Sequence, residues 1–273
     1  MFGDDFMLNI EGSLDLFKDS LRYPIENPKV WLSFIILFFI TTIFSLTVFS
    51  TIDNTPLFVI FGILFIVMSV ITLGFSMKII RNQIYGSDVI VDDMDEIPSN
   101  IKDDFIEGIE AVVVEVIYLV IPAMFLFILT YITGLFDWIV YFTIQLLMSS
   151  GIDGVVFSQL SSFIHTLISI VFCGVAVESV MFLISTIAIA KHAADESMMS
   201  ALNIRGILSK ISSIGWDEYV VYLILLILTI SVLNIILTIV CMIPYVGKVI
   251  SFTMVGSYIL IVTNVSLGKI YTQ

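Results

Sequence analysis

The chain has 273 residues, of which 59% are hydrophobic and 13% are charged, whereas an ordinary soluble domain is about 45–50% apolar and about 25% charged. Its mean hydropathy is +1.11. A chain of this size cannot bury so many apolar side chains in a core, so part of them must face lipid. The formal net charge of −13 argues against nucleic acid as a partner, because binding to phosphates requires clustered Lys and Arg. The composition therefore predicts an integral membrane protein.

Six segments are long and apolar enough to cross a bilayer, for which a helix needs about 20 residues. They are Val30–Ser50, Leu57–Ile80, Ala111–Tyr131, Ile168–Ala190, Tyr219–Met242 and Val249–Leu267. Residues 135–153 are expected to form an interfacial or re-entrant segment, followed by one long helix that begins outside the bilayer. The alternative is two extra spans. The predicted fold is an all-α, polytopic helical bundle of about six transmembrane helices, with interfacial amphipathic helices on the cytoplasmic side.

The basic residues give the expected orientation. With six spans, every Lys and Arg except Lys248 lies on one side of the membrane, and the positive-inside rule assigns that side to the cytoplasm. The first residues, MFGDDFMLN, are acidic where a signal peptide would be positive, so we expect the first hydrophobic segment to be retained. The sequence thus predicts a multi-pass protein of the cell (plasma) membrane with both termini in the cytoplasm.

Amphipathic stretches precede the first, third and fifth spans and suggest a repeat. Each carries apolar residues at helical spacing: Met7, Ile10, Leu14, Phe17 and Leu21; Ile101, Phe105 and Ile109; Ile204, Ile207, Leu208, Ile211 and Ile214. Such helices lie at the headgroup boundary with their apolar face toward the membrane. We expect a single transmembrane domain over residues 1–273, with possible units at 4–80, 98–190 and 197–270. Each unit would be an interfacial helix followed by a transmembrane hairpin.

Glu178 is the main candidate for a functional group, because an ionisable side chain in hydrocarbon costs several kcal/mol. It lies about 12 residues, or roughly 18 Å, before the cytoplasmic end of its span, which is near the midplane. Asn234 lies at a similar depth in the fifth span, and this suggests a contact between the two. The carboxyl binds a proton, a cation or a substrate, or it makes an interhelical hydrogen bond that fixes packing. The third alternative is a misplaced span, which would put Glu178 at a wet surface.

Glu115 and Tyr118 are the other candidate residues within the membrane. Glu115 lies about one turn inside the third span, from where its side chain can reach the cytoplasmic surface. Pro122 lacks a backbone N–H and crowds the carbonyl of Tyr118. These residues predict a kinked third span with a polar stripe, either as a packing kink or as a functional feature.

The cytoplasmic loop 86–107 contains eight acids and one base, Lys102. Its run D-D-M-D-E lacks the Gly and the spaced Glu of an EF-hand loop. We interpret the loop as a solvated acidic face, and the alternative is a docking surface for a basic protein partner. Membrane lipids are the other expected partners. Cys173, Cys241 and the two histidines match no metal or disulfide pattern, so no metal and no cofactor is expected.

Short motifs in this sequence resemble those of a known family. The acidic loop continues through D-E-I-P and F-I-E-G-I into a span that reads I-Y-L-V-I-P, and C-M-I-P-Y-V-G-K precedes a last span that ends in G-K-I-Y. This order resembles an uncharacterised family of prokaryotic multi-pass membrane proteins, domain of unknown function 4013, over residues Leu14–Tyr271. The resemblance implies a membrane location and a similar layout of spans, but no activity and no catalytic residues.

Three functions compete on the sequence. The leading hypothesis is a non-enzymatic scaffold or partner-binding membrane subunit, since few charges lie within the spans. The second is a transporter or channel with a midplane carboxyl at Glu178. The third is an intramembrane enzyme, for which Asp137, Asp153 and His165 are the only candidates; the common nucleotide-binding and hydrolase motifs are absent from the sequence.

Overall fold

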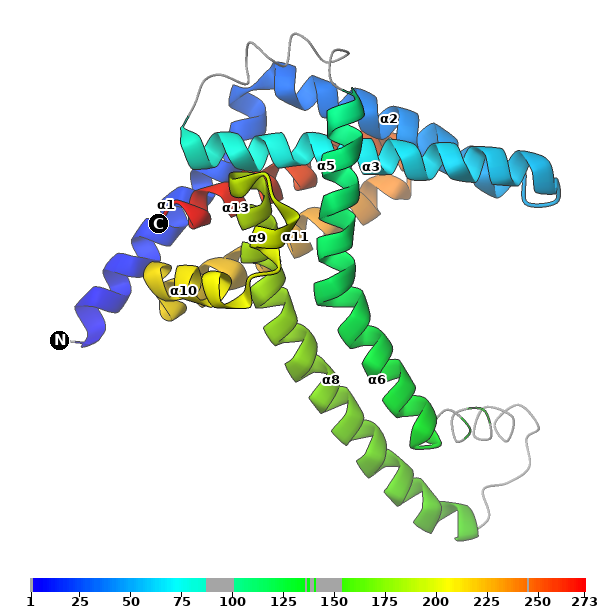
Figure 1. Cartoon of the computed structure of the whole chain (residues 1–273). Coiled ribbons are helices and arrows are strands. Elements are labelled where there is room, and N and C mark those ends of the chain that lie inside the picture. The colour runs from blue at the N-terminus through cyan, green and yellow to red at the C-terminus, as the bar shows by residue number, and fades with distance from the viewer. Residues whose placement is uncertain (1, 87–100, 136, 138–139, 141–153, 245) are drawn as a thin grey trace. The chain divides into compact units, whose positions relative to one another are not determined.

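Figure 1 shows the computed structural model of the chain, which describes residues 2–86, 101–135, 137, 140, 154–244 and 246–273. These residues fold into helices, and no strand occurs among them. Six of the described helices are long and apolar enough to cross a membrane. The chain is therefore an all-α, multi-pass membrane protein, as its composition predicts.

The spanning helices coincide with the segments expected from hydropathy. Two of them are built from more than one element, because π-helical turns interrupt the third and the sixth spans. The fourth span lies within a single helix of 42 residues. The elements are α2 (Pro28–Ser50); α3 (Thr55–Tyr85); α5 (Ile101–Glu115), η1 (Val116–Val120) and α6 (Ile121–Ile132); α8 (Gly154–Asp195); α11 (Trp216–Cys241); and α12 (Gly247–Ile250), η2 (Ser251–Gly256) and α13 (Ser257–Tyr271).

The region between the third and fourth spans was expected to hold an interfacial or re-entrant segment. Most of residues 135–153 lie outside the described part of the chain, so that expectation stays a prediction. The long helix expected after it is α8.

Two of the three amphipathic stretches form separate helices. These are α1 (Phe2–Glu26) and α10 (Ile204–Ile214), and α10 ends at Gly215, whose φ of 102° suits glycine. A short helix α9 (Met198–Ala201) precedes α10. The stretch before the third span differs from the expectation, because α5 continues through η1 into α6. No proline lies between Ile101 and Glu115 to stop the helix.

The chain divides into two compact units. The first contains residues 1–114 and 186–273, and the second contains residues 115–185. The first unit thus combines α1, α2, α3, most of α5 and the last three turns of α8 with α9 to α13. The second unit holds η1, α6 and the larger part of α8. The repeat of three units expected from the sequence stays a prediction.

Helix α3 lies at the centre of the first unit. Phe75 and Ile79 of α3 pack with residues of α2 and α13 in one apolar core, where the Phe34 and Phe75 ring centroids are 5.0 Å apart. Farther along, a Cβ on Gly268 of α13 would lie 2.8 Å from the carbonyl oxygen of Ile80. The backbones of α3 and α13 therefore approach as closely as glycine allows.

Polar side chains of other helices bind the C-terminal half of α1 within the first unit. The Tyr258 hydroxyl donates to the carbonyl of Leu21 at 2.6 Å, and Lys269 Nζ lies 3.5 Å from Asp19 Oδ2. Burial raises the pKa of the Tyr23 phenol, and its hydrogen bond with Gln83 of α3 opposes that rise. This half of α1 is thus held by α3 and by the C-terminal helix α13, and Figure 1 shows the C-terminus beside it.

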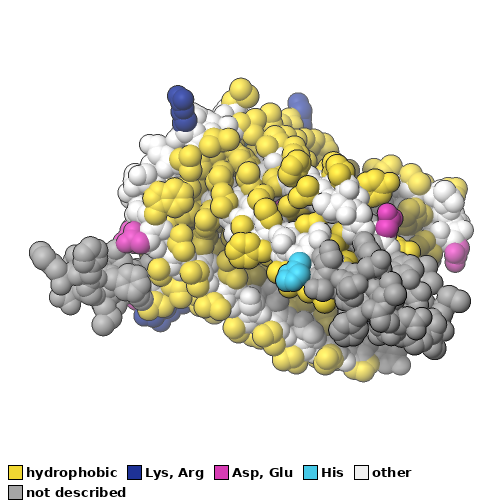
Figure 2. Space-filling view, turned by 90° about the horizontal axis from the view of Figure 1, so that it is seen from below, with side chains coloured by type: hydrophobic (Ala, Val, Ile, Leu, Met, Phe, Trp, Pro, Cys, Tyr) yellow, Lys and Arg dark blue, Asp and Glu magenta, His cyan; other side chains and the backbone are white. Residues whose placement is uncertain are grey.

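Much of the described surface of the second unit is apolar and exposed. No residue of α6 is buried, and apolar side chains of α8 such as Val171, Phe172, Val175 and Val180 are more than half exposed. Figure 2 shows one face of the molecule, on which hydrophobic side chains make up most of the described surface. In a membrane such a surface faces lipid or another protein.

Candidate functional site

The main polar site of the first unit begins where α3 and α5 cross. A Cβ on Gly74 would collide with the carbonyl of Asp104, and a Cβ on Gly108 would collide with the carbonyl of Val70. At each contact a glycine of one helix lets the backbone of the other helix approach closely. This close crossing brings the polar residues on the following turns of α3 opposite the acids of α5.

Lys78 and Asp104 form the first ion pair beside this crossing. Lys78 Nζ lies 2.7 Å from Asp104 Oδ1, and the Asp104 side chain is only 6% exposed. Asp104 also lies in the first turn of α5, where a negative charge is stabilised by the helix dipole. The pair is thus largely removed from solvent, although the sequence predicted a solvated acidic face.

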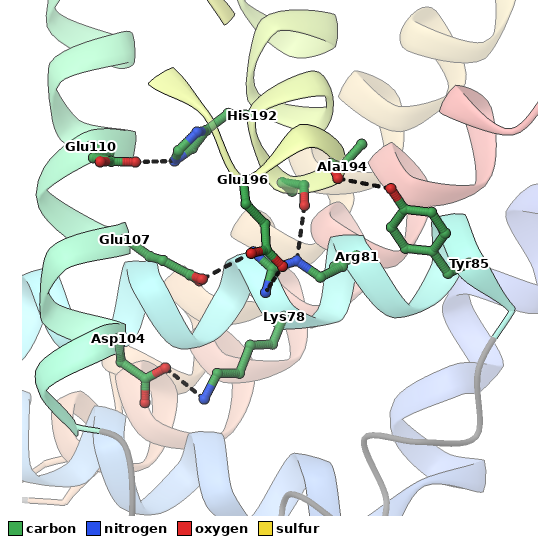
Figure 3. Close-up of polar contacts among 10 residues, drawn as sticks. Lys78, Arg81, Tyr85, Asp104, Glu107, Glu110, His192, Ala194 and Glu196 are labelled. Carbon is green, nitrogen blue, oxygen red and sulfur yellow. Dashed lines mark hydrogen bonds and ion pairs between the residues drawn. The ribbon is translucent and has the colours of Figure 1, made fainter. Parts of the chain in front are cut away.

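Arg81 connects three segments of the first unit (Figure 3). Its Nε donates to the carbonyl of Ala193 at 2.9 Å and its Nη2 donates to Glu107 Oε1 at 3.0 Å. Its Nη1 lies 3.2 Å from Glu196 Oε1. The planar, forked guanidinium can donate in several directions at once, which the ammonium of a lysine cannot reproduce.

The end of α8 is capped by side chains from α3. The last carbonyls of a helix have no partner within it, and here Arg81 binds that of Ala193 while the Tyr85 hydroxyl donates to that of Ala194 at 2.8 Å. The chain then turns at Glu196, whose φ of 50° is unusual for a residue other than glycine. The ion pair with Arg81 holds this turn in place.

His192 completes the site from the last turns of α8. It is 2% exposed, and its Nε2 lies 3.6 Å from Glu110 Oε2. Its buried Nδ1 has no hydrogen-bond partner among the described residues, and neither has Glu107 Oε2. The site thus contains two buried polar atoms that no described group satisfies.

We call this set of residues the charged junction. It joins α3, α5 and the end of α8 and consists of Lys78, Arg81, Tyr85, Asp104, Glu107, Glu110, His192 and Glu196. Its groups bind one another, so the arrangement chiefly fixes three helices at one end of the first unit. The sequence analysis assigned Asp104 and Glu107 to a solvated face of the loop 86–107, but their carboxylates pair with Lys78 and Arg81.

The sequence analysis missed the charged junction, although one signal was present. Lys78, Arg81 and Tyr85 recur at i, i+3 and i+7, and Asp104, Glu107 and Glu110 recur at i, i+3 and i+6. Each set follows one face of its helix. Two helix faces of opposite charge on either side of one loop predict a paired surface.

Glu178 lies on α8 within the second unit. Its side chain is half-buried, and its Oε1 is buried without a hydrogen-bond partner among the described residues. Most of its neighbours in α8 are apolar, and a Cβ on Gly174, one turn before it, would lie 3.4 Å from Leu126 Cδ1 of α6. Gly174 and Glu178 lie one turn apart on the same face of α8, and this face is directed toward α6. The Glu178 carboxyl on this face thus lacks a hydrogen-bond partner for one oxygen.

The other predicted site residues lie on three further elements, α11, α5 and η1. Asn234 is exposed on α11 in the first unit, and its Nδ2 donates to the carbonyl of Ile230 in the same helix at 2.8 Å. The proposed contact between Glu178 and Asn234 stays a prediction. Glu115 is half-buried at the end of α5, and Tyr118 is 4% exposed within η1, where the sequence predicted a kink before Pro122.

Among the described residues, no group of three or more His, Cys, Asp or Glu side chains is arranged so that it could hold a metal ion. Of the three residues named for an intramembrane enzyme, Asp153 lies outside the described part of the chain.

Comparison with known proteins identifies the family. Residues 57–243, more than half of the chain, match the family model described as Protein of unknown function (DUF4013). The chain belongs to the DUF4013 family. This confirms the resemblance seen in the sequence motifs, and the matched part of this DUF4013 protein includes the charged junction and Glu178. No curated protein and no solved structure matches the chain.

Proposed function

We propose that this DUF4013 protein is a non-enzymatic, partner-binding subunit of the cell membrane, with both termini in the cytoplasm. The transmembrane helix of another protein would bind the second unit at Glu178. The observation that carries this proposal is the Glu178 carboxyl, which has a buried oxygen without a described partner on a helix whose neighbouring apolar side chains are exposed.

The argument rests on the free energy of a carboxyl in lipid. An ionisable group in the hydrocarbon costs several kcal/mol unless it is neutral and hydrogen-bonded or faces protein or water. Helices in lipid associate through packing and interhelical hydrogen bonds. A partner helix with a Ser, Thr, Asn or Lys opposite Glu178 would satisfy the carboxyl and cover part of the exposed apolar surface of α8.

The charged junction supports this reading in a different way. It ties the cytoplasmic ends of α3, α5 and α8 together, and α5 and α8 lead directly into the second unit. The two helices that would bind the partner are thus anchored at one end, while their membrane-embedded parts keep their side chains exposed. Such an anchored, exposed hairpin suits binding better than catalysis.

Purification from membranes in a mild detergent tests the proposal. The wild-type chain should retain a stoichiometric membrane-protein partner, and Glu178→Leu should lose it. Glu178→Gln should keep the partner, because an amide still donates and accepts hydrogen bonds. Cys173→Ser, at an exposed position of the same helix, is the matched control. Recovery of the wild-type chain alone would contradict the proposal.

A transporter or channel is the second candidate, and the π-helix η1 favours it. Irregular backbone within a membrane span is tolerated where it lines a cavity or site, and η1 lies directly before Pro122. In that case Glu178 would bind a proton or a cation. Glu178→Gln would then abolish ion or solute flux in reconstituted vesicles, whereas the partner-binding function tolerates this substitution.

A further inference from the structure

The segment from Ser197 to Gly215, which contains α9 and α10, has the opposite charge from the rest of the chain. It contains Arg205 and Lys210 but no acid, whereas the whole chain has a formal net charge of −13. The next acids are Glu196 before it and Asp217 after it. A positive surface segment on such an acidic protein is complementary to an anionic ligand.

Helix α10 has a buried apolar stripe and, beside it, an exposed apolar flank. Ile207, Ile211 and Ile214 are buried in the first unit. Next to this buried stripe, Ile204 is 51% exposed and Leu208 is 38% exposed. At 100° per residue, the exposed pair lies about 50–90° around the helix from the centre of the stripe. An apolar flank of α10 is therefore left uncovered by protein.

Arg205 borders this apolar flank on the side away from the protein. It is exposed, and by helical geometry it lies about 60° beyond Leu208. Lys210 lies on the opposite side of α10, where its Nζ is 5.0 Å from the centroid of the Tyr271 ring. Arg205 is thus the base that adjoins the apolar flank. Met199 and Trp216, before and after α10, are also exposed.

We propose that α10 binds an anionic phospholipid from the bilayer. Ile204 and Leu208 would contact the upper part of the acyl chains, and Arg205 would pair with the phosphate of the headgroup. This combination of an exposed apolar flank, an adjacent base and a neighbouring Trp is the chemistry of a helix that lies in the membrane interface. Arg205 and Lys210, with no acid between Ser197 and Gly215, favour an anionic over a zwitterionic headgroup.

Native mass spectrometry of the detergent-solubilised full chain tests this directly. The protein is equilibrated with equal amounts of phosphatidylglycerol and phosphatidylcholine, and the bound lipids are counted. We expect more phosphatidylglycerol than phosphatidylcholine on the wild type. Arg205→Gln should lower the phosphatidylglycerol occupancy about three- to five-fold. Lys248→Gln removes an exposed base at another position and is the matched control, which should leave the occupancy unchanged.

Two further measurements test whether the lipid binds at α10 and whether the ligand is a lipid and not a free anion. Leu208→Ser should reduce binding of both lipids, because the apolar flank contacts acyl chains. Free inorganic phosphate in millimolar excess should not displace bound phosphatidylglycerol. Equal binding of the two lipids by the wild type, or equal losses in Arg205→Gln and Lys248→Gln, would overturn the proposal. Displacement by inorganic phosphate would overturn it too, because it would indicate a site for free anions.

Discussion

A Cβ added to Gly74 of α3 would lie 2.9 Å from the backbone nitrogen of Gly108 in α5, and closer still to the carbonyl of Asp104. The two helices therefore cross with their backbones in contact. The ion pair between Lys78 and Asp104 lies directly beside this crossing. The charged junction thus depends on two residues that carry no charge.

Replacing Gly74 or Gly108 by Ala should destabilise the first unit. Neither contact can relax by a side-chain rotation, because each new Cβ would meet backbone atoms. We expect a loss of about 2–3 kcal/mol, which corresponds to a fall of roughly 4–10 °C in the unfolding temperature of the solubilised protein. Gly62→Ala in the same helix is the control, since no atom lies within 4 Å of its added Cβ, and it should not lower that temperature.

Arg81→Ala should destabilise the protein more than the loss of a surface ion pair does. The substitution leaves Glu107 and the carbonyl of Ala193 without their donor in a partly buried place. We expect a loss of about 2–3 kcal/mol in chemical denaturation, and Arg81→Lys should recover only part of it. Lys18→Ala breaks an exposed pair with Asp15 and should cost less than about 1 kcal/mol. Equal losses for the two alanine variants would contradict the role given to Arg81.

Two tyrosine variants should loosen different segments. Tyr258→Phe removes the hydrogen bond to Leu21 of α1, and Tyr85→Phe removes the one to Ala194 at the end of α8. Each loss of about 1 kcal/mol should speed local amide hydrogen exchange about five-fold. Hydrogen exchange read by mass spectrometry should show faster exchange in α1 only for the first variant and at the end of α8 only for the second. The same change in both variants would show that the two contacts act globally.

Hydropathy is a sufficient guide to the spans of this protein. The expected segment Val30–Ser50 lies within α2 (Pro28–Ser50), and the amphipathic helix expected at Ile204–Ile214 has these bounds in the structure. Lipid imposes a minimum length and an apolar surface on every crossing, so these features can be read residue by residue. Gly215 stops α10 for an equally local reason, its positive φ.

The charged junction could not be derived in the same way. Arg81 pairs with residues 26 and 112 positions away, and local patterns do not specify which distant helix comes near. The sequence analysis therefore used Lys78 and Arg81, together with the other bases, only to assign the orientation of the spans. The π-helices η1 and η2 were also missed, because a single extra residue in a helical turn leaves the apolar pattern almost unchanged.

Cysteine labelling tests the proposed orientation. In a background without Cys173 and Cys241, a membrane-impermeant maleimide should label Lys248→Cys on intact cells. It should label Ser213→Cys, an exposed position of α10, only after the membrane is opened. All bases except Lys248 are expected on the cytoplasmic side. Labelling of both positions from outside would refute the proposed topology.

Photocrosslinking at α8 in native membranes tests the proposed partner binding most directly. Position 175, where a photoreactive residue would replace Val175, lies one turn from Glu178 and about 60° from it around the helix. Val180 lies on the opposite side of the helix. The side chains of Val175 and Val180 are 62% and 52% exposed. We predict a crosslink to one membrane protein from position 175 but not from position 180. Glu178→Leu should abolish it, and Glu178→Gln should preserve it. Crosslinks to lipid alone at both positions, or a protein crosslink that survives Glu178→Leu, would contradict the partner-binding function.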